Sequence, residues 1–444
     1  MAQPIEHRLY GCVNFDDVRH HNAGWASIAG QTAYRIASTK DLQSDVSWLT
    51  NLDYDMSYKA GFAVHAGFRR SDYLSEYFIK ADNKALVGQG FESARFDFSK
   101  MLDVDSNNGA LLTQRSAVIF DRLMRLSNRW LNLQDLPLYT LANGFRERLI
   151  GHDAVLPGSI VTALTDATAS FVWTERNDDS DKNNQLLTLI LPRVTHGVKC
   201  ATLQEPKGDW VPLSLPSTNE QDIDEWVSNH NGYLVVQMAI DNMNEEANRL
   251  INFGSGRSAR QWITGIELSE LNKRGKVTLK KAYRPTTLEP LQALEPLLAM
   301  QDDVHDLSFS TGLFWQNIWT GLCAKKTPPA HILKTNKSIN SLAPFIRATD
   351  RNACFLAALT LQKKGLQVVS YGKGRITISY DGNANRLAEH IRQTQLIPSF
   401  LNSVARQDVA IDTPIQMLQE IYLQGDFKRL NDADQQITES LCQN

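Results

Sequence analysis

The sequence lacks most of the features by which metal centres and disulfide-rich proteins are identified. Its 444 residues contain only five cysteines, at the widely separated positions Cys12, Cys200, Cys323, Cys354 and Cys442. An odd number at such spacings fits neither a disulfide framework nor a CxxC zinc site. We therefore expect no structural metal and no cofactor, and we interpret the thiols as small buried apolar groups.

Long apolar runs are also missing. No window reaches about 18 uninterrupted apolar residues, so the sequence predicts no membrane span. The first residues, MAQPIEH, lack the charged start and the apolar stretch of a signal peptide. Together these absences predict a cytoplasmic location and no membrane partner.

Catalytic signatures are scarce as well. The sequence has no GxxxxGK[ST] phosphate loop, no GxSxG nucleophile turn, no HExxH motif and no set of kinase motifs. The best catalytic candidate is the pair Asp53 and Asp55, whose carboxylates would point the same way on a strand and could share a divalent cation. Asp103 and Asp105 repeat this spacing just before a turn. A metal-dependent nuclease or nucleotidyl transferase using Asp53 and Asp55 is therefore one alternative function.

The sequence does contain positive charge gathered into two stretches, although the whole chain has a net charge of −3. Basic residues far outnumber acidic ones in residues 254–284, the first basic segment, and again in residues 325–375, the second basic segment. Positive charge concentrated on an acidic protein indicates a polyanionic partner, most often nucleic acid.

The first basic segment offers two kinds of anion contact. In residues 254–260 glycines leave the backbone free to surround a phosphate, and two arginines could clamp it. Residues 261–268 and 276–283 are predicted to form a hairpin with a basic tip. A polar surface loop and a solvated hairpin are the alternatives. The residues predicted to contact nucleic acid in this segment are Arg257, Arg260, Lys273, Arg274, Lys276, Lys280 and Lys281.

The second basic segment predicts a helix over residues 351–364, followed by strands at 366–370 and 376–380 that a glycine-rich basic turn connects. A winged helix has this order, with its helix in the major groove and its hairpin tip on the neighbouring backbone. Many other folds share the order, and lysines at a helix end also suit the helix dipole. The residues predicted to contact nucleic acid in this segment are Lys325, Lys326, Lys334, Lys337, Arg351, Lys363, Lys364, Lys373 and Arg375.

The pattern of apolar residues predicts an α+β fold. Strands are expected at 8–15 and 233–240, and residues 169–175 and 185–191 are expected to pair as a hairpin. Helices are expected at 113–132 and 311–323. In the second of these, Trp315 and Trp319 are four residues apart and are predicted to face the core. A short helical turn over 338–343 is expected to stop at Pro344.

The same pattern predicts three domains, with a boundary in the proline-rich, acidic stretch 284–306. Residues 1–150 would form a mixed α and β domain. Residues 151–285 would form a β-rich domain that carries the basic hairpin. Residues 286–444 would form a mainly helical, basic domain that contains the winged-helix-like block and ends in an acidic tail from residue 407.

A binding signal without a catalytic signature favours one function. We predict a non-catalytic subunit or adaptor of a prokaryotic-type nucleoprotein complex, which binds DNA or RNA and has protein partners. A second alternative, besides the nuclease, is a protein-interaction scaffold. In that case the basic segments would dock on the acidic surface of a partner or on the acidic tail of the chain itself.

Overall fold

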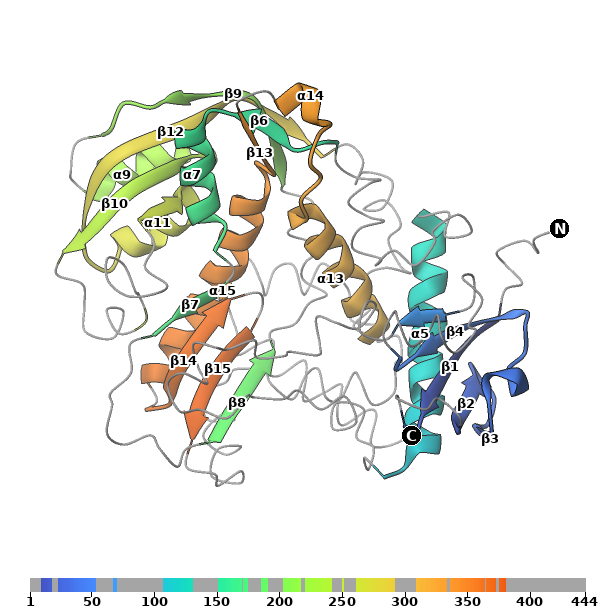
Figure 1. Ribbon diagram of the computed structural model, residues 1–444. Coiled ribbons are helices and arrows are strands. Elements are labelled where there is room, and N and C mark those ends of the chain that lie inside the picture. Colours follow the sequence, from blue (N-terminus) through green and yellow to red (C-terminus); the bar gives the residue numbers. More distant parts are fainter. Residues whose placement is uncertain are drawn as a thin grey trace.

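The computed structural model of the chain combines helices and strands (Figure 1). Helices make up 40% and strands 34% of the described residues, so the predicted α+β fold is confirmed. No described helix is both long and apolar enough to cross a bilayer. The structure describes residues 9–17, 23–52, 67–69, 107–130, 151–169, 171–174, 185–190, 203–216, 220–241, 250, 261–291, 309–333, 336–363, 365–372 and 375–380.

The N-terminal strands form one sheet with α5 packed on it. β1 to β3 are antiparallel neighbours, whereas β4 runs parallel to β1 and β5 parallel to β4. The helix α5 (Gly109–Trp130) lies on β1 and β2, where Phe120 packs edge-on against Tyr10. The strands, in sheet order, are β3 (Tyr34–Ile36), β2 (Gly24–Ile28), β1 (Leu9–Phe15), β4 (Val46–Thr50) and β5 (Gly67–Arg69).

A second sheet, which we call the central sheet, is antiparallel and has helices on both faces. Neighbouring residues of β10 point to opposite faces because side chains alternate along a strand. Val235 packs with α7 (Gly158–Ala167), and Val236 packs in the core cluster that also holds residues of α9 and α11. The strands, in sheet order, are β11 (Trp262–Thr264), β10 (Val235–Asp241), β12 (Lys276–Pro290) and β9 (Gln204–Pro212).

The predicted basic hairpin is wrong. Its two arms, β11 and β12, both pair with β10 and not with each other. The helix α11 (Gly265–Asn272) lies between them in the chain. Its start is fixed by a capping box, in which the Glu267 carboxylate accepts the backbone N–H of Thr264 at 3.4 Å. The helix α9 (Glu220–Ser228) lies beside α11.

The third sheet shows that the hairpin predicted for residues 169–191 is wrong. Its order is β7-β14-β15-β8, so the β14–β15 hairpin lies between the two strands that were expected to pair. A separate two-stranded sheet joins β6 (Ala154–Leu156) to β13 (Lys337–Ile339). Strands from the segments 151–285 and 286–444 thus hydrogen-bond in both sheets. The strands of the third sheet are β7 (Phe171–Trp173), β14 (Gln367–Gly372), β15 (Arg375–Tyr380) and β8 (Gln185–Ile190).

The helix α15 (Ala343–Lys363) runs from the central sheet to the third sheet (Figure 1). Asn340 fixes its start, because the amide oxygen accepts the N–H of Leu342 at 3.1 Å and the amide nitrogen donates to Leu322 at 2.7 Å. The latter bond also caps α13 (Phe309–Cys323). The helical turn predicted for 338–343 is wrong, because residues 338 and 339 belong to the strand Lys337–Ile339. The predicted stop at Pro344 is also wrong, because Pro344 lies in the first turn of α15, where a missing N–H costs no helical bond.

The order helix, strand, strand predicted for the second basic segment is present. The structure does not support the docking of this helix in a major groove, as in a winged helix. A helix that reads a major groove must expose one face. Most residues of α15 are buried, and the helix packs against β14, α11, α13 and α7. It is therefore a core helix of the described fold.

Candidate nucleic-acid interface

The predicted contact residues separate into groups in the structure. Lys363 is exposed at the end of α15, and only the backbone of Arg375 is described, at the start of β15. The acidic tail from residue 407 and both aspartate pairs lie outside the described residues, so the predictions built on them stay predictions. The basic residues that also lie outside the described residues are Arg257, Arg260, Lys334, Lys364 and Lys373.

Arg351 lies in the interior and not on the surface, with an exposed fraction of only 1%. Its guanidinium forms a bidentate pair with Glu267, with both N–O distances 2.8 Å. It also donates to the carbonyl of Ala167 at 2.8 Å and to that of Ala169, at the end of α7. A cation suits this position because helix carbonyls carry partial negative charge there. Arg351 therefore ties α15, α11 and α7 together and is not accessible to a phosphate.

Lys273 and Arg274 follow α11 and share one carboxylate partner. Glu270 lies 3.7 Å from the Lys273 ammonium and is ion-paired and hydrogen-bonded to Arg274. The Arg274 guanidinium also lies 5.6 Å from the ring centroid of Phe355 on α15. Both cations lie on the α11 side of the central sheet, and their charge is partly neutralised.

A β-bulge explains why neighbouring lysines of β12 are both exposed. The register with β10 shifts between Gln237 and Met238, which pair with Lys281 and Leu279. Lys280 is the unpaired extra residue of this bulge, so Lys280 and Lys281 are both exposed although they are neighbours. Lys276 is exposed at the start of the strand.

Strand register also shows which face of the central sheet Lys281 occupies. Gln237 pairs with Trp262 on one side and with Lys281 on the other, so these three side chains share a face. Two residues earlier on β10, Val235 pairs with Tyr283 and packs with α7. Lys281 therefore lies on the α7 side, beside the aromatic residues Trp262 and Tyr283.

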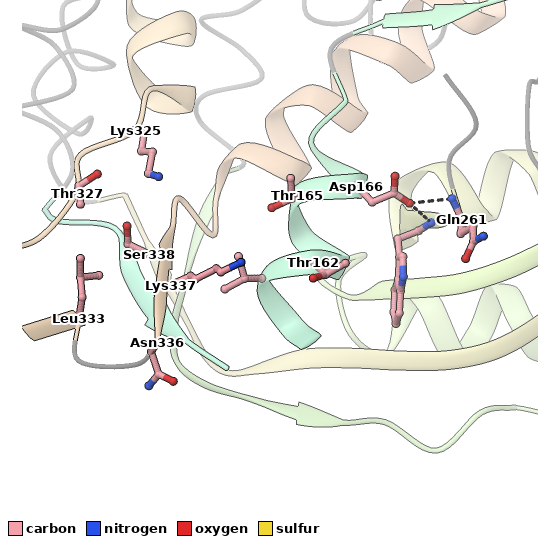
Figure 2. A pocket seen from close by; sticks show the side chains of 12 residues that line it. Thr162, Thr165, Asp166, Gln261, Lys325, Thr327, Leu333, Asn336, Lys337 and Ser338 are labelled. Carbon is pink, nitrogen blue, oxygen red and sulfur yellow. Dashed lines mark hydrogen bonds between the residues drawn. The ribbon is translucent and has the colours of Figure 1, made fainter. Parts of the chain in front are cut away.

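A cavity of about 880 Å³ opens on this same side (Figure 2). Its walls come from α7, from the start of β11, from the segment after α13, and from α14 (Ala330–Leu333) and β13. Two of its lysines, Lys325 and Lys337, belong to the second basic segment, whereas Gln261 and Trp262 belong to the first. The cavity thus brings the two basic segments together in space, which the sequence could not show.

Hydrogen bonds to two aspartate carboxylates hold the walls of the cavity in place. The Asp166 carboxylate, at the end of α7, accepts the backbone N–H groups of Gln261 and Trp262, both at 2.8 Å. The backbone around Lys326 is fixed in the same way by Asp153, which accepts from its N–H at 3.0 Å and donates its own N–H to the Lys326 carbonyl at 2.9 Å. Lys325 therefore projects from a tethered segment and not from a free loop.

The cavity combines a flat aromatic surface with cations and hydroxyl groups. The Trp262 ring lies 5.5 Å from that of Tyr283 at an interplanar angle of 20°, which is a stacked arrangement. Thr162 and Thr165 line the cavity from α7, three residues apart and so on one helix face. Aromatic faces, hydroxyl groups and lysines are the groups that bind bases, sugars and phosphates.

Sequence reasoning missed the aromatic, acidic and hydroxyl residues that lie on the same face as these lysines. Trp262 and Tyr283 both lie within the first basic segment, so aromatic residues interleaved with basic ones were a usable signal. Asp166, Thr162 and Thr165 carried no signal, because they lie about a hundred residues earlier in the chain. Only the packing of α7 against β10 and β11 brings them to the site.

The electrostatics of this face differ from those of the α11 side. Among the described residues, no carboxylate forms an ion pair with Lys281, Lys325 or Lys337. Asp166 is the one acidic residue among the described residues that line the cavity. We call Lys281, Lys325 and Lys337 the lysine face. Within the described stretches no cluster of three or more metal-ligating side chains is found.

Comparison with known proteins gives only distant structural similarity. No protein-family model and no curated protein matches the chain. Phi29 DNA polymerase complexed with primer-template DNA and incoming nucleotides superposes with a TM-score of 0.40 at 10% identity, over 85% of this chain and 80% of that chain. Phi29 DNA polymerase complexed with single-stranded DNA also gives 0.40 at 10% identity, over 84% and 80%.

Proposed function

We propose that the protein binds nucleic acid through the lysine face, without chemistry of its own, as a subunit or adaptor of a nucleoprotein complex. One observation carries this proposal: the cavity unites lysines of the second basic segment with Trp262 and Gln261 of the first, on the face that also bears Lys281. Cations without carboxylate partners keep their charge available for phosphates, whereas paired cations do not.

The affinity for nucleic acid should depend on the salt concentration in a way that can be calculated. Each lysine that neutralises a phosphate releases counterions, so the affinity falls as the salt concentration rises. Three contacts contribute a slope of about −2 to −3 in a plot of log K against log salt concentration. Cations outside the described residues would add to this slope, so the informative quantity is the difference between variants.

The test compares two triple variants of the full chain by fluorescence anisotropy with labelled single-stranded and duplex probes. One variant carries Lys281→Gln, Lys325→Gln and Lys337→Gln. The control removes the same charge elsewhere, at Lys40, Lys207 and Lys273, which are all exposed. Lys207 is a fitting control because it lies on β9 and is ion-paired with Glu205 and Glu289, and the charge of Glu205 raises its pKa.

The lysine-face variant is expected to lose about 2 to 3 from the magnitude of the salt slope, because each lost phosphate contact removes about 1. The control variant is expected to keep the wild-type slope. Equal losses in the two variants, or no measurable binding by the wild-type protein at about 50 mM salt, would overturn the proposal.

A further inference from the structure

The cavity has the size of a small-ligand site and not that of a duplex groove. Ligand pockets typically measure about 300–1,000 Å³, and this one measures about 880 Å³. In duplex DNA the faces of the bases are buried in the stack, so an aromatic wall inside a cavity meets only an unpaired or extruded base. The volume therefore suits a ligand of one or two nucleotides.

The aromatic wall is held in place before any ligand arrives. Trp262 stacks on Tyr283, and the backbone of Trp262 is fixed by its hydrogen bond to Asp166. Because Trp262 is half-buried and lines the cavity, part of its indole remains available to a ligand. An aromatic ring with a fixed orientation binds a base face at a low entropic cost and without sequence preference.

Polar groups beside the indole suit the edge of a base. One oxygen of the Asp166 carboxylate accepts two backbone N–H groups, and the other has no hydrogen-bond partner among the described residues. The Gln261 side-chain oxygen accepts from Gln237 at 3.0 Å, which leaves its N–H groups directed elsewhere. Asp166 therefore keeps an acceptor oxygen, and Gln261 keeps the N–H donors of its side-chain amide.

The cations lie across the cavity from this polar pair. In Figure 2 Lys325, Thr327 and Ser338 line one side, whereas Gln261 and Asp166 line the other, and Lys337 extends toward Thr162. A nucleotide placed with its base on Trp262 would direct its phosphate to these lysines. The arrangement matches single-stranded binding sites, which pair a stacking surface with a positively charged track.

We infer that the cavity holds an unpaired nucleotide of a nucleic-acid strand, with its base stacked on Trp262 and its phosphate on Lys325 and Lys337. This inference rests on the proposed function and sharpens it, because it predicts a preference for single strands over blunt duplex. Neither stacking on the indole nor contact with the ammonium groups depends on base identity.

The experiment measures the affinity of the full chain for a dT oligomer of about 15 nucleotides, for the matching rU oligomer and for blunt duplex of the same length. The variants are Trp262→Leu and Trp262→Phe. Trp226→Leu is the control, because Trp226 lies on α9, on the other face of the sheet, and its indole nitrogen donates to the Ser214 carbonyl at 3.1 Å.

Trp262→Leu is expected to weaken binding of the oligomers by about 5- to 150-fold and to leave duplex binding within about twofold of wild type. Trp262→Phe keeps a stacking surface and should retain most of the affinity. Trp226→Leu should bind like wild type. The loss should appear with both the dT and the rU oligomer, because stacking requires only a base face, and unchanged affinity for both would overturn the inference.

A second measurement uses the wild-type protein, so its result does not depend on whether a variant folds. An oligomer containing 5-bromodeoxyuridine is photocrosslinked to the wild-type protein, and the attached peptide is identified by mass spectrometry. We expect the peptide that contains Trp262. Binding of oligomer and duplex with equal affinity, together with a crosslink elsewhere, overturns the inference and leaves the proposed function standing. No binding of either probe overturns both.

Discussion

Basic side chains are ion-paired on one face of the central sheet and unpaired with described carboxylates on the other. On the α11 side, Lys273 and Arg274 share Glu270, and Glu267 of the same helix holds the buried Arg351 of α15 in a bidentate pair. On the α7 side, Lys281, Lys325 and Lys337 form no ion pair with a described carboxylate. The count of basic residues in a segment therefore says little about binding until their partners are known.

This difference also separates structural from functional cations. An arginine suits the interior because its planar guanidinium can satisfy a carboxylate and two carbonyl groups at once, as Arg351 does with Glu267, Ala167 and Ala169. A lysine ammonium is compact and strongly hydrated, and the lysines of β12 and β13 are accordingly exposed to solvent. Substitutions in the buried pair, in the lysine face and at Glu270 test this division.

Removal of one partner of the buried pair should have the largest effect. Arg351→Ala leaves the Glu267 carboxylate buried without its counter-charge and frees the carbonyl groups at the end of α7, so the free energy of unfolding should fall by about 3–5 kcal/mol. Urea denaturation measures this loss. The double variant Arg351→Met with Glu267→Met should recover much of the stability, because no lone charge remains. If the free energy of unfolding fell by less than about 1 kcal/mol in Arg351→Ala, the pair of Arg351 and Glu267 would not be important for stability.

Charge reversal at matched positions on the two faces should have an intermediate effect. Lys281→Glu on the α7 side should reduce the magnitude of the salt slope for nucleic-acid binding by at least about 1, because a phosphate contact is replaced by repulsion. Lys273→Glu makes the same charge change on the α11 side and should leave the slope unchanged. If the two variants lose affinity equally, the division of the sheet into a binding face and a structural face is refuted.

The smallest effect is expected from Glu270→Gln, which frees Lys273 and Arg274 without altering the α7 side. The loss in free energy of unfolding should be below about 1 kcal/mol, as for other partly exposed pairs. Binding of the dT oligomer should not improve more than about twofold, because the two freed cations lie on the other side of the sheet. A tenfold gain would place the binding surface on the α11 side.

Much of the fold could be predicted from local patterns. The periodicity at 113–132 and 311–323 predicted α5 and α13, and Trp315 and Trp319 are fully buried as their spacing indicated. The helix α11 was missed because its short apolar run resembles a strand, although the Thr264-x-x-Glu267 capping box was visible in the sequence. The pairing of β7 with β14 and of β8 with β15 was missed because both partner strands lie beyond residue 360. Local sequence patterns do not indicate partners so far along the chain.

The candidate site was predictable only in part, for a similar physical reason. The exposed lysines were identified by composition, but Arg351 was assigned to the surface because its partner Glu267 lies 84 residues away in the sequence. Long-range ion pairs leave no mark in charge counts along the chain. The cavity itself depends on the contacts of α7 with β11 and with β13, and these elements lie far apart in the sequence.

The most direct test of the division between the two faces is acetylation of lysines in the free and the nucleic-acid-bound protein, quantified residue by residue by mass spectrometry. Our account predicts that the dT oligomer protects Lys281, Lys325 and Lys337, while Lys273 and Lys207 react at unchanged rates. Protection of Lys273 with undiminished reactivity of Lys325 and Lys337 would contradict it.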